Sequence, residues 1–102
     1  LQLTMSRNDS MRVELRDEAR EDLAKGAWFY ERQSTGLGDY FLDSLRTALK
    51  GLESPLVIYE IVFGFHRKLP KRFPFAVYFL LASSVVDVVA ILDLSSGSRG
   101  DN

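Results

Sequence analysis

The stretch that decides the fold reads Phe75-Ala-Val-Tyr-Phe-Leu-Leu-Ala-Ser-Ser-Val-Val-Asp-Val-Val-Ala-Ile-Leu-Asp-Leu94. Its two halves, 75–81 and 85–94, are rich in the β-branched and aromatic residues that favour strands. Only Ala82-Ser-Ser84 separates them, and a connection this short joins antiparallel strands. The stretch therefore predicts a β-hairpin, the strongest strand signal in the chain.

Two amphipathic helices are expected before this hairpin. The first begins at Arg16 or Asp17, where acidic side chains complement the positive end of the helix dipole. The second runs from about Leu37 to Glu53 with one apolar face and is ended by Pro55. The break at 33–36 is so short that the two helices should form an antiparallel hairpin.

The remaining strand signals are weaker. Residues 12–15 alternate polar with apolar, 57–63 are β-branched and aromatic, and 66–71 alternate up to Pro70. Proline donates no hydrogen bond to a strand ladder, so the strand at Pro70 should lie at an edge or a bulge. In the order β-α-α-β-β-β these elements predict an α+β domain, a helical hairpin packed on one face of a twisted antiparallel sheet.

With 102 residues the chain is one domain. Residues 1–10 are polar and aperiodic, and we interpret them as a disordered extension or tag remnant, with Met5 or Met11 as candidate starts. The domain then spans 11–94, and the polar residues 95–102 are expected to be a flexible tail.

Several classes of chemistry find no support in the composition. The chain has no cysteine and a single histidine, His66, so a disulfide framework, a thiolate nucleophile and a zinc site are not expected. No serine lies in a nucleophile-elbow motif, and no glycine-rich stretch has the form of a phosphate loop. No apolar run reaches the length needed to span a bilayer, and no export signal precedes the domain. We expect a cytoplasmic protein without cofactor, metal or membrane contact.

The strand 75–81 is apolar on both faces, whereas a helical hairpin can cover only one of them. Apolar surface left on a small domain marks a protein partner. We assign this partner-binding surface to Phe73, Phe75, Tyr78 and Phe79. The alternative is a central strand whose second face is covered by Trp28 or by 57–63.

A basic cluster precedes this strand: Arg67, Lys68, Lys71 and Arg72 supply four cations within six positions, with no acid among them. Cations along an edge strand protect against aggregation. They also form sites for phosphates or acidic side chains. Because four cations exceed what edge protection needs, we predict a target-binding site. The formal net charge of −1 argues against indiscriminate binding of nucleic acid by the whole molecule.

Several segments carry a family resemblance. The sequence resembles ParE-like toxins of the RelE/ParE toxin–antitoxin superfamily, also called plasmid stabilisation proteins. The segments that carry this resemblance are Met11-Arg-Val-Glu-Leu-Arg-Asp-Glu-Ala-Arg-Glu-Asp-Leu23, Trp28-Phe-Tyr-Glu31, Gly36-Leu-Gly-Asp-Tyr-Phe-Leu42, Val62-Phe-Gly64, Arg67-Lys68 and Lys71-Arg-Phe-Pro-Phe-Ala-Val-Tyr78.

This resemblance implies a bacterial toxin whose apolar surface is wrapped by a cognate antitoxin. ParE-like members poison DNA gyrase, whereas RelE-like members cleave mRNA in the ribosome. Family members commonly end the last strand with a histidine and arginines, but here residues 90–96 supply Asp93 and serines. RNA cleavage needs a group that activates the ribose hydroxyl, so we expect no catalytic residue and favour a gyrase-binding toxin. The alternatives are a ribosome-dependent endonuclease and an inactive relative that retains the fold and partner binding.

Overall fold

The computed structural model describes residues 11–54, 57 and 59–97. The extension predicted at 1–10 and the last five residues of the predicted tail lie outside the described residues. In chain order the elements are β1 (Arg12–Leu15), α1 (Asp17–Gln33), α2 (Leu37–Gly51), β2 (Glu60–Val62), β3 (Phe65–Lys68), β4 (Phe75–Ala82), β5 (Val85–Asp93) and α3 (Leu94–Gly97).

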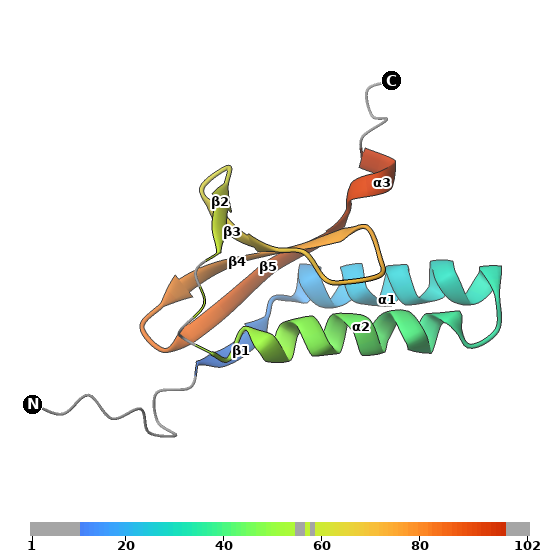
Figure 1. Ribbon diagram of the computed structural model, residues 1–102, viewed down its shortest axis with the longest axis horizontal. Helices are drawn as coiled ribbons and strands as arrows, with labels where there is room; N and C mark the ends of the chain where they lie inside the picture. Colours follow the sequence, from blue (N-terminus) through green and yellow to red (C-terminus); the bar gives the residue numbers. More distant parts are fainter. Residues whose placement is uncertain (1–10, 55–56, 58, 98–102) are drawn as a thin grey trace, which may run out of the picture.

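The predicted α+β class is confirmed, with α1 and α2 forming a hairpin on one side of a five-stranded sheet (Figure 1). The strand order is β1-β5-β4-β3-β2. Neighbouring strands from β2 to β5 are antiparallel, but β1 runs parallel to β5. The sheet is therefore mixed, because the helical hairpin between β1 and β2 places the first and last strands side by side in the same direction.

The predicted hairpin of the two longest strands is confirmed as β4 and β5, with one irregularity. Tyr78 pairs with Ala90 and Phe79 pairs with Val88, so Val89 is an extra residue in β5. Such a bulge shifts the alternation of side chains along a strand. As a result Val88 and Ile91, three positions apart, both face the core.

The other two strands are shorter than the patterns predicted. β2 keeps only Glu60–Val62 of the expected 57–63, and β3 ends at Lys68 instead of residue 71. Leu69 and Pro70 leave the sheet and begin the loop that leads to β4. This loop carries Phe73 into the core, where its side chain is 9% exposed.

The helical hairpin is held by a carboxylate at its turn and by close packing between helices. The Glu31 carboxylate accepts hydrogen bonds from the backbone N–H groups of Gly36 and Gly38 at 3.0–3.1 Å. Gly26 of α1 lies against the ring of Phe41 in α2, and a Cβ there would stand 2.6 Å from the ring carbon Cζ. The close approach of the helices thus depends on this glycine.

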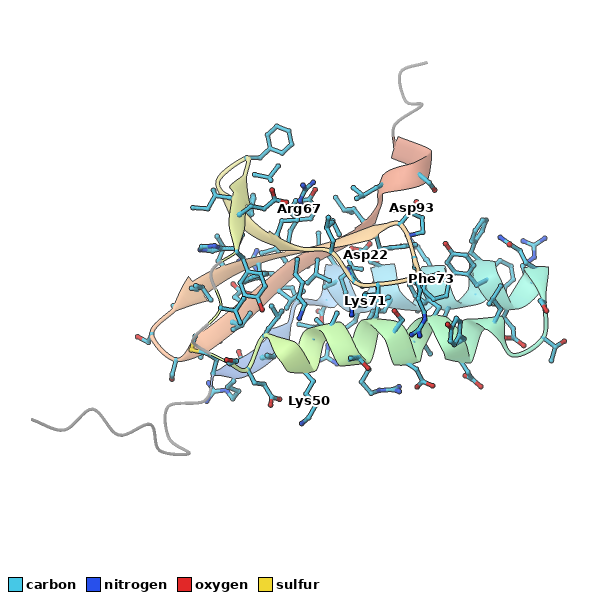
Figure 2. The ribbon with its side chains drawn as sticks, in the orientation of Figure 1. Asp22, Lys50, Arg67, Lys71, Phe73 and Asp93 are labelled. Atoms are coloured by element: carbon cyan, nitrogen blue, oxygen red, sulfur yellow. The ribbon has the colours of Figure 1, made fainter. Side chains whose placement is uncertain are left out.

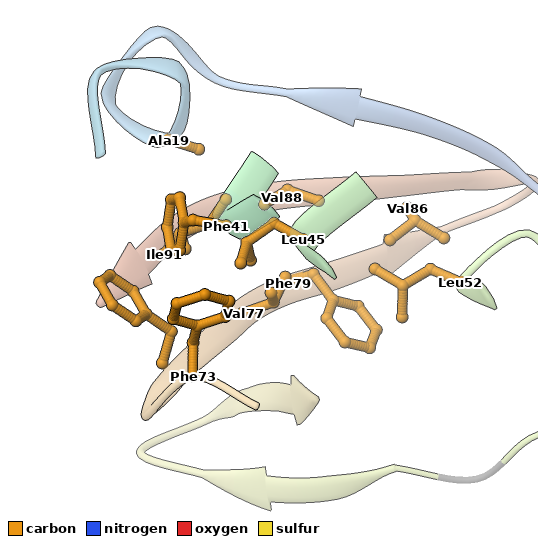
Figure 3. Close-up of a cluster of buried hydrophobic side chains, with 11 residues drawn as sticks. Ala19, Phe41, Leu45, Leu52, Phe73, Val77, Phe79, Val86, Val88 and Ile91 are labelled. Carbon is orange, nitrogen blue, oxygen red and sulfur yellow. The ribbon is translucent and has the colours of Figure 1, made fainter. Parts of the chain in front are cut away.

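The core fills the space between the hairpin and the sheet (Figure 3). Its buried members are Ala19, Phe41, Leu45, Leu52, Phe73, Phe75, Val77, Phe79, Val86, Val88 and Ile91. Phe41 is fully buried, with ring centroids 5.2 Å from Phe73 and 4.9 Å from Phe75.

Two tyrosines at the border of this core predict an alkaline limit to stability. Burial raises the pKa of the Tyr59 phenol, and burial followed by the nearby Asp93 carboxylate raises that of Tyr30. Above pH 10 these phenols lose protons in the unfolded chain before the folded one, so the free energy of unfolding falls as pH rises. We expect chemical denaturation between pH 8 and 11 to show a steeper decline for the native chain than for the variant Tyr30→Phe/Tyr59→Phe. Equal slopes would contradict the prediction.

Candidate functional site: an open sheet face and a basic loop

We call the sheet face opposite the helical hairpin the open sheet face. Strand pairing places Glu60, Phe65, Arg67, Tyr78, Ala90 and Leu92 on it. Within the described residues neither α1 nor α2 covers this face (Figure 1). The open sheet face is therefore one part of the fold on which apolar side chains meet solvent, as Trp28 and Phe29 of α1 also do.

An apolar groove of about 230 Å³ lies on this face and is lined by Phe63, Phe65, Tyr78, Val89, Ala90 and Leu92. Phe63 is 91% exposed and Leu92 is 48% exposed. Exposed apolar side chains that gather around a depression are typical of an interaction surface.

The partner-binding residues assigned from the sequence divide between the core and this face. Phe73, Phe75 and Phe79 are buried, because β4 turns its odd-numbered residues toward the helices and the loop inserts Phe73 beside Phe41. They cannot touch a partner in this conformation. Tyr78 is the member of the set that lies on the open sheet face, where it lines the groove.

Phe63, Val89 and Leu92 are groove residues that sequence reasoning missed. A signal for Phe63 was present: an aromatic residue stood directly before the expected turn glycine, Gly64. For Val89 and Leu92 no such signal was present, because residues 88–92 are all apolar and do not show which of them face outward.

Phe63 occupies a backbone conformation that is unfavourable for its side chain. Phe63 and Gly64 are the two central residues of the β2–β3 turn, with φ of 56° and 84°. Two positive φ values are typical of a type I′ turn, which favours Asn-Gly. A bulky residue with positive φ is an outlier, and such strain gathers at functional sites. The turn thus presents an exposed aromatic ring at a conformational cost.

Replacing Phe63 with asparagine is expected to raise the free energy of unfolding by about 1 kcal/mol, because asparagine tolerates the left-handed region and little packing is lost. Thermal denaturation followed by circular dichroism would show the increase. Gly64→Ala is a control that should instead lower the free energy of unfolding, because alanine is strained at φ 84°. A destabilised Phe63→Asn variant would show that the ring supports the fold.

The basic cluster does not form one continuous surface. Arg67 lies on the open sheet face, where its Nε donates to the Glu60 carboxylate at 2.6 Å. Hydrogen bonds to Glu60 and then to Tyr78 raise the pKa of the Arg67 guanidinium. Arg67 is thus fixed beside the apolar groove as half of an ion pair.

Lys68 points to the other side of the sheet. Its Nζ lies 5.8 Å from the centroid of the Tyr59 ring and against Gly51, at the C-terminal end of α2. Burial lowers the pKa of this ammonium group. A cation at this position is favoured by the negative end of the helix dipole.

Lys71 and Arg72 belong to the loop between β3 and β4. Figure 2 shows Arg67 on the side of the sheet away from the helices and Lys71 beside α2. Lys68, Lys71 and Arg72 line one groove against α2, and Arg67 is not among its lining residues. The structure therefore joins three of the four cations and separates the fourth.

Two further polar residues, His66 of β3 and Asp93 at the end of β5, are held by local contacts. The His66 ring stacks on Phe79 with centroids 5.4 Å apart, and its Nδ1 is buried without a hydrogen-bond partner among the described residues. Asp93 accepts hydrogen bonds from the backbone N–H and the hydroxyl of Ser95, at the start of α3. In the part of the chain that the structure describes, no three histidine or carboxylate side chains gather as metal ligands would.

None of the described helices has both the length and the apolar character of a bilayer span. The helix α3 occupies 94–97, so the described part of the predicted tail includes one helical turn.

A comparison with family models found no match, and a comparison with curated protein sequences found none either. Among solved structures, the chain is similar to a chain of the chromosomal ParDE TA system from P. aeruginosa, with a TM-score of 0.70 and 16% sequence identity. The match covers 84% of this chain and 98% of the other. At this identity the similarity shows a shared fold, the fold that the sequence resemblance implied.

Proposed function

We propose that this chain is the toxin component of a bacterial type II toxin–antitoxin system. In this proposal a cognate antitoxin neutralises it by covering the open sheet face. The toxin acts in the cytoplasm by binding DNA gyrase, without catalysing a reaction of its own. Two independent likenesses support the proposal: the sequence segments that resemble ParE-like toxins and the fold shared with a chain of a ParDE system.

The observation that carries the proposal is the apolar groove of the open sheet face with Phe63 at its rim. A domain that binds no partner would gain stability by giving this turn an asparagine and the groove polar residues. Phe63 and Leu92 are instead exposed and apolar. A protein surface placed over the groove would remove both side chains from water, which supports a neutralising partner at this face.

The polar groups favour action by binding over RNA cleavage. A nuclease needs a group that moves a proton to or from the ribose hydroxyl. The half-buried His66 ring is stacked on Phe79, and Asp93 is engaged at the start of α3. Arg67 could stabilise phosphate charge, but it is already paired with Glu60.

Induced expression in a bacterial host tests the proposal. We expect growth to stop, and purified protein to inhibit supercoiling by gyrase while leaving ribosome-bound mRNA intact. Co-expression of the product of the reading frame next to its gene should restore growth. Cleaved mRNA with unaffected supercoiling would instead establish an endonuclease. Unaffected growth, supercoiling and mRNA would identify an inactive relative.

A further inference from the structure

The groove between α2 and the β3–β4 loop has the properties of an anion site. Its volume is about 350 Å³. It is lined by Tyr40, Asp43, Ser44, Thr47, Ala48, Lys68, Leu69, Pro70, Lys71 and Arg72. Three cations therefore face one acid, in a chain whose formal net charge is −1.

The loop that carries two of these cations is held in place. The Ser44 hydroxyl of α2 donates to the Lys71 carbonyl oxygen at 2.7 Å. Pro70 and Phe73, on either side, are buried, and the Phe73 ring packs against Phe41. A fixed backbone lowers the entropy that a ligand must remove on binding.

The cations of the groove are not neutralised within the described part of the chain. Every ion pair there uses another cation: Arg12, Arg16, Arg46, Lys50 or Arg67. The acid of the groove, Asp43, is already paired with Arg46 at 2.7 Å. Burial of Lys68 without an acid lowers its pKa, and an anion bound beside it would reverse that shift. The groove thus lacks the negative charge that its cations would favour.

Arg72 adds a strained backbone to this charge. Its φ is 78°, in the left-handed region that favours glycine, and its guanidinium lies 5.5 Å from the centroid of the Tyr40 ring. The Tyr40 ring lies against one face of the Arg72 guanidinium and restricts its movement, and the guanidinium remains at the groove. Strain of this kind is concentrated at binding and catalytic sites.

We infer that this groove binds the phosphate backbone of a nucleic acid, with Lys68, Lys71 and Arg72 as cations for successive phosphate groups. Thr47 supplies a hydroxyl at the same groove, and a phosphate accepts hydrogen bonds from hydroxyl and cationic donors together. The groove is larger than one phosphate and can admit the adjoining sugar. The inference rests on the proposed function only for the source of the ligand, since a gyrase-bound toxin would meet duplex DNA.

Binding of a fluorescein-labelled DNA duplex to the isolated full chain, followed by anisotropy over a salt series, tests the inference. Each phosphate contact contributes about 0.9 to the slope of log K against log salt. The variant Lys71→Ala/Arg72→Gly should reduce that slope by about 2 and weaken binding at least tenfold at low salt. Glycine is chosen at Arg72 because it relieves the positive φ, so an unchanged or raised Tm would separate lost binding from lost folding.

Arg20→Ala/Lys25→Ala is the matched control, because it removes two exposed cations of α1 that do not line this groove. It should leave the salt slope within about 0.5 of the native value. Equal losses in both variants would show nonspecific attraction and overturn the inference, as would native binding by Lys71→Ala/Arg72→Gly.

Two further ligands identify the chemistry that is recognised. Titration with inorganic phosphate, observed by amide NMR, should shift resonances of residues 68–73. A poly-glutamate peptide that shifts them when neither phosphate nor DNA does would overturn the inference in favour of an acidic protein segment. These measurements do not depend on bacterial growth. If the chain binds DNA through this groove but is not toxic, the inference is supported and the proposed function is refuted.

Discussion

Replacing Phe41 with alanine is expected to lower the free energy of unfolding by about 3–5 kcal/mol. The Phe41 side chain is fully buried between the helices and the sheet, and its ring contacts those of Tyr30, Phe73 and Phe75. Its removal leaves a cavity beside Gly26 of the other helix, which has no side chain to fill it. A domain of this size has about 5–15 kcal/mol of stability in total, so the variant should be close to unfolding at 37 °C.

Urea denaturation of the native chain, Phe41→Ala and Phe29→Ala measures this effect. Phe29→Ala is the same chemical change at a position that is 52% exposed, and about 1 kcal/mol or less is expected for it. Equal losses for the two variants would mean that Phe41 is not the centre of the core.

Most of the fold could be predicted because its longest elements carry strong local patterns. The helical hairpin and the β4–β5 hairpin follow from apolar periodicity and from short connections. The direction of β1 could not be predicted, since four alternating residues do not indicate which strand they will pair with. The bulge at Val89 was also hidden, because residues 88–92 around it are all apolar and have no polar alternation for a bulge to interrupt.

The two proposed binding surfaces were predicted less well, for a related reason. Local sequence indicated a basic cluster, but Leu69 and Pro70 end β3 and send Lys71 and Arg72 into a loop, away from Arg67. Phe73 was assigned to a partner surface because nothing in the sequence shows that the loop folds back into the core. Only the tertiary structure distinguishes a buried aromatic residue from an exposed one in such a segment.

Replacing Leu92 with glutamate is expected to weaken binding of the proposed antitoxin at least 100-fold, or about 2.7 kcal/mol. Leu92 lines the apolar groove of the open sheet face, and a charge buried there by a partner would lack a compensating cation from the groove. Folding should be little affected, because the side chain is already 48% exposed. Isothermal titration with the antitoxin measures the loss directly. If the proposed function holds, cells that express both proteins should also stop growing when this chain carries Leu92→Glu.

Leu81→Glu is the matched control, since Leu81 is 50% exposed but does not line the groove. It should retain the native affinity for the antitoxin. If Leu81→Glu weakens binding and Leu92→Glu does not, the partner binds elsewhere on this chain.

The most direct measurement is methyl NMR of the labelled chain during titration with the product of the reading frame next to its gene. We predict that the methyl resonances of Val89 and Leu92, at the groove, shift until one equivalent is bound, while those of the buried Val86 and Val88 change little. Complex formation that leaves Val89 and Leu92 unchanged would contradict a partner on the open sheet face.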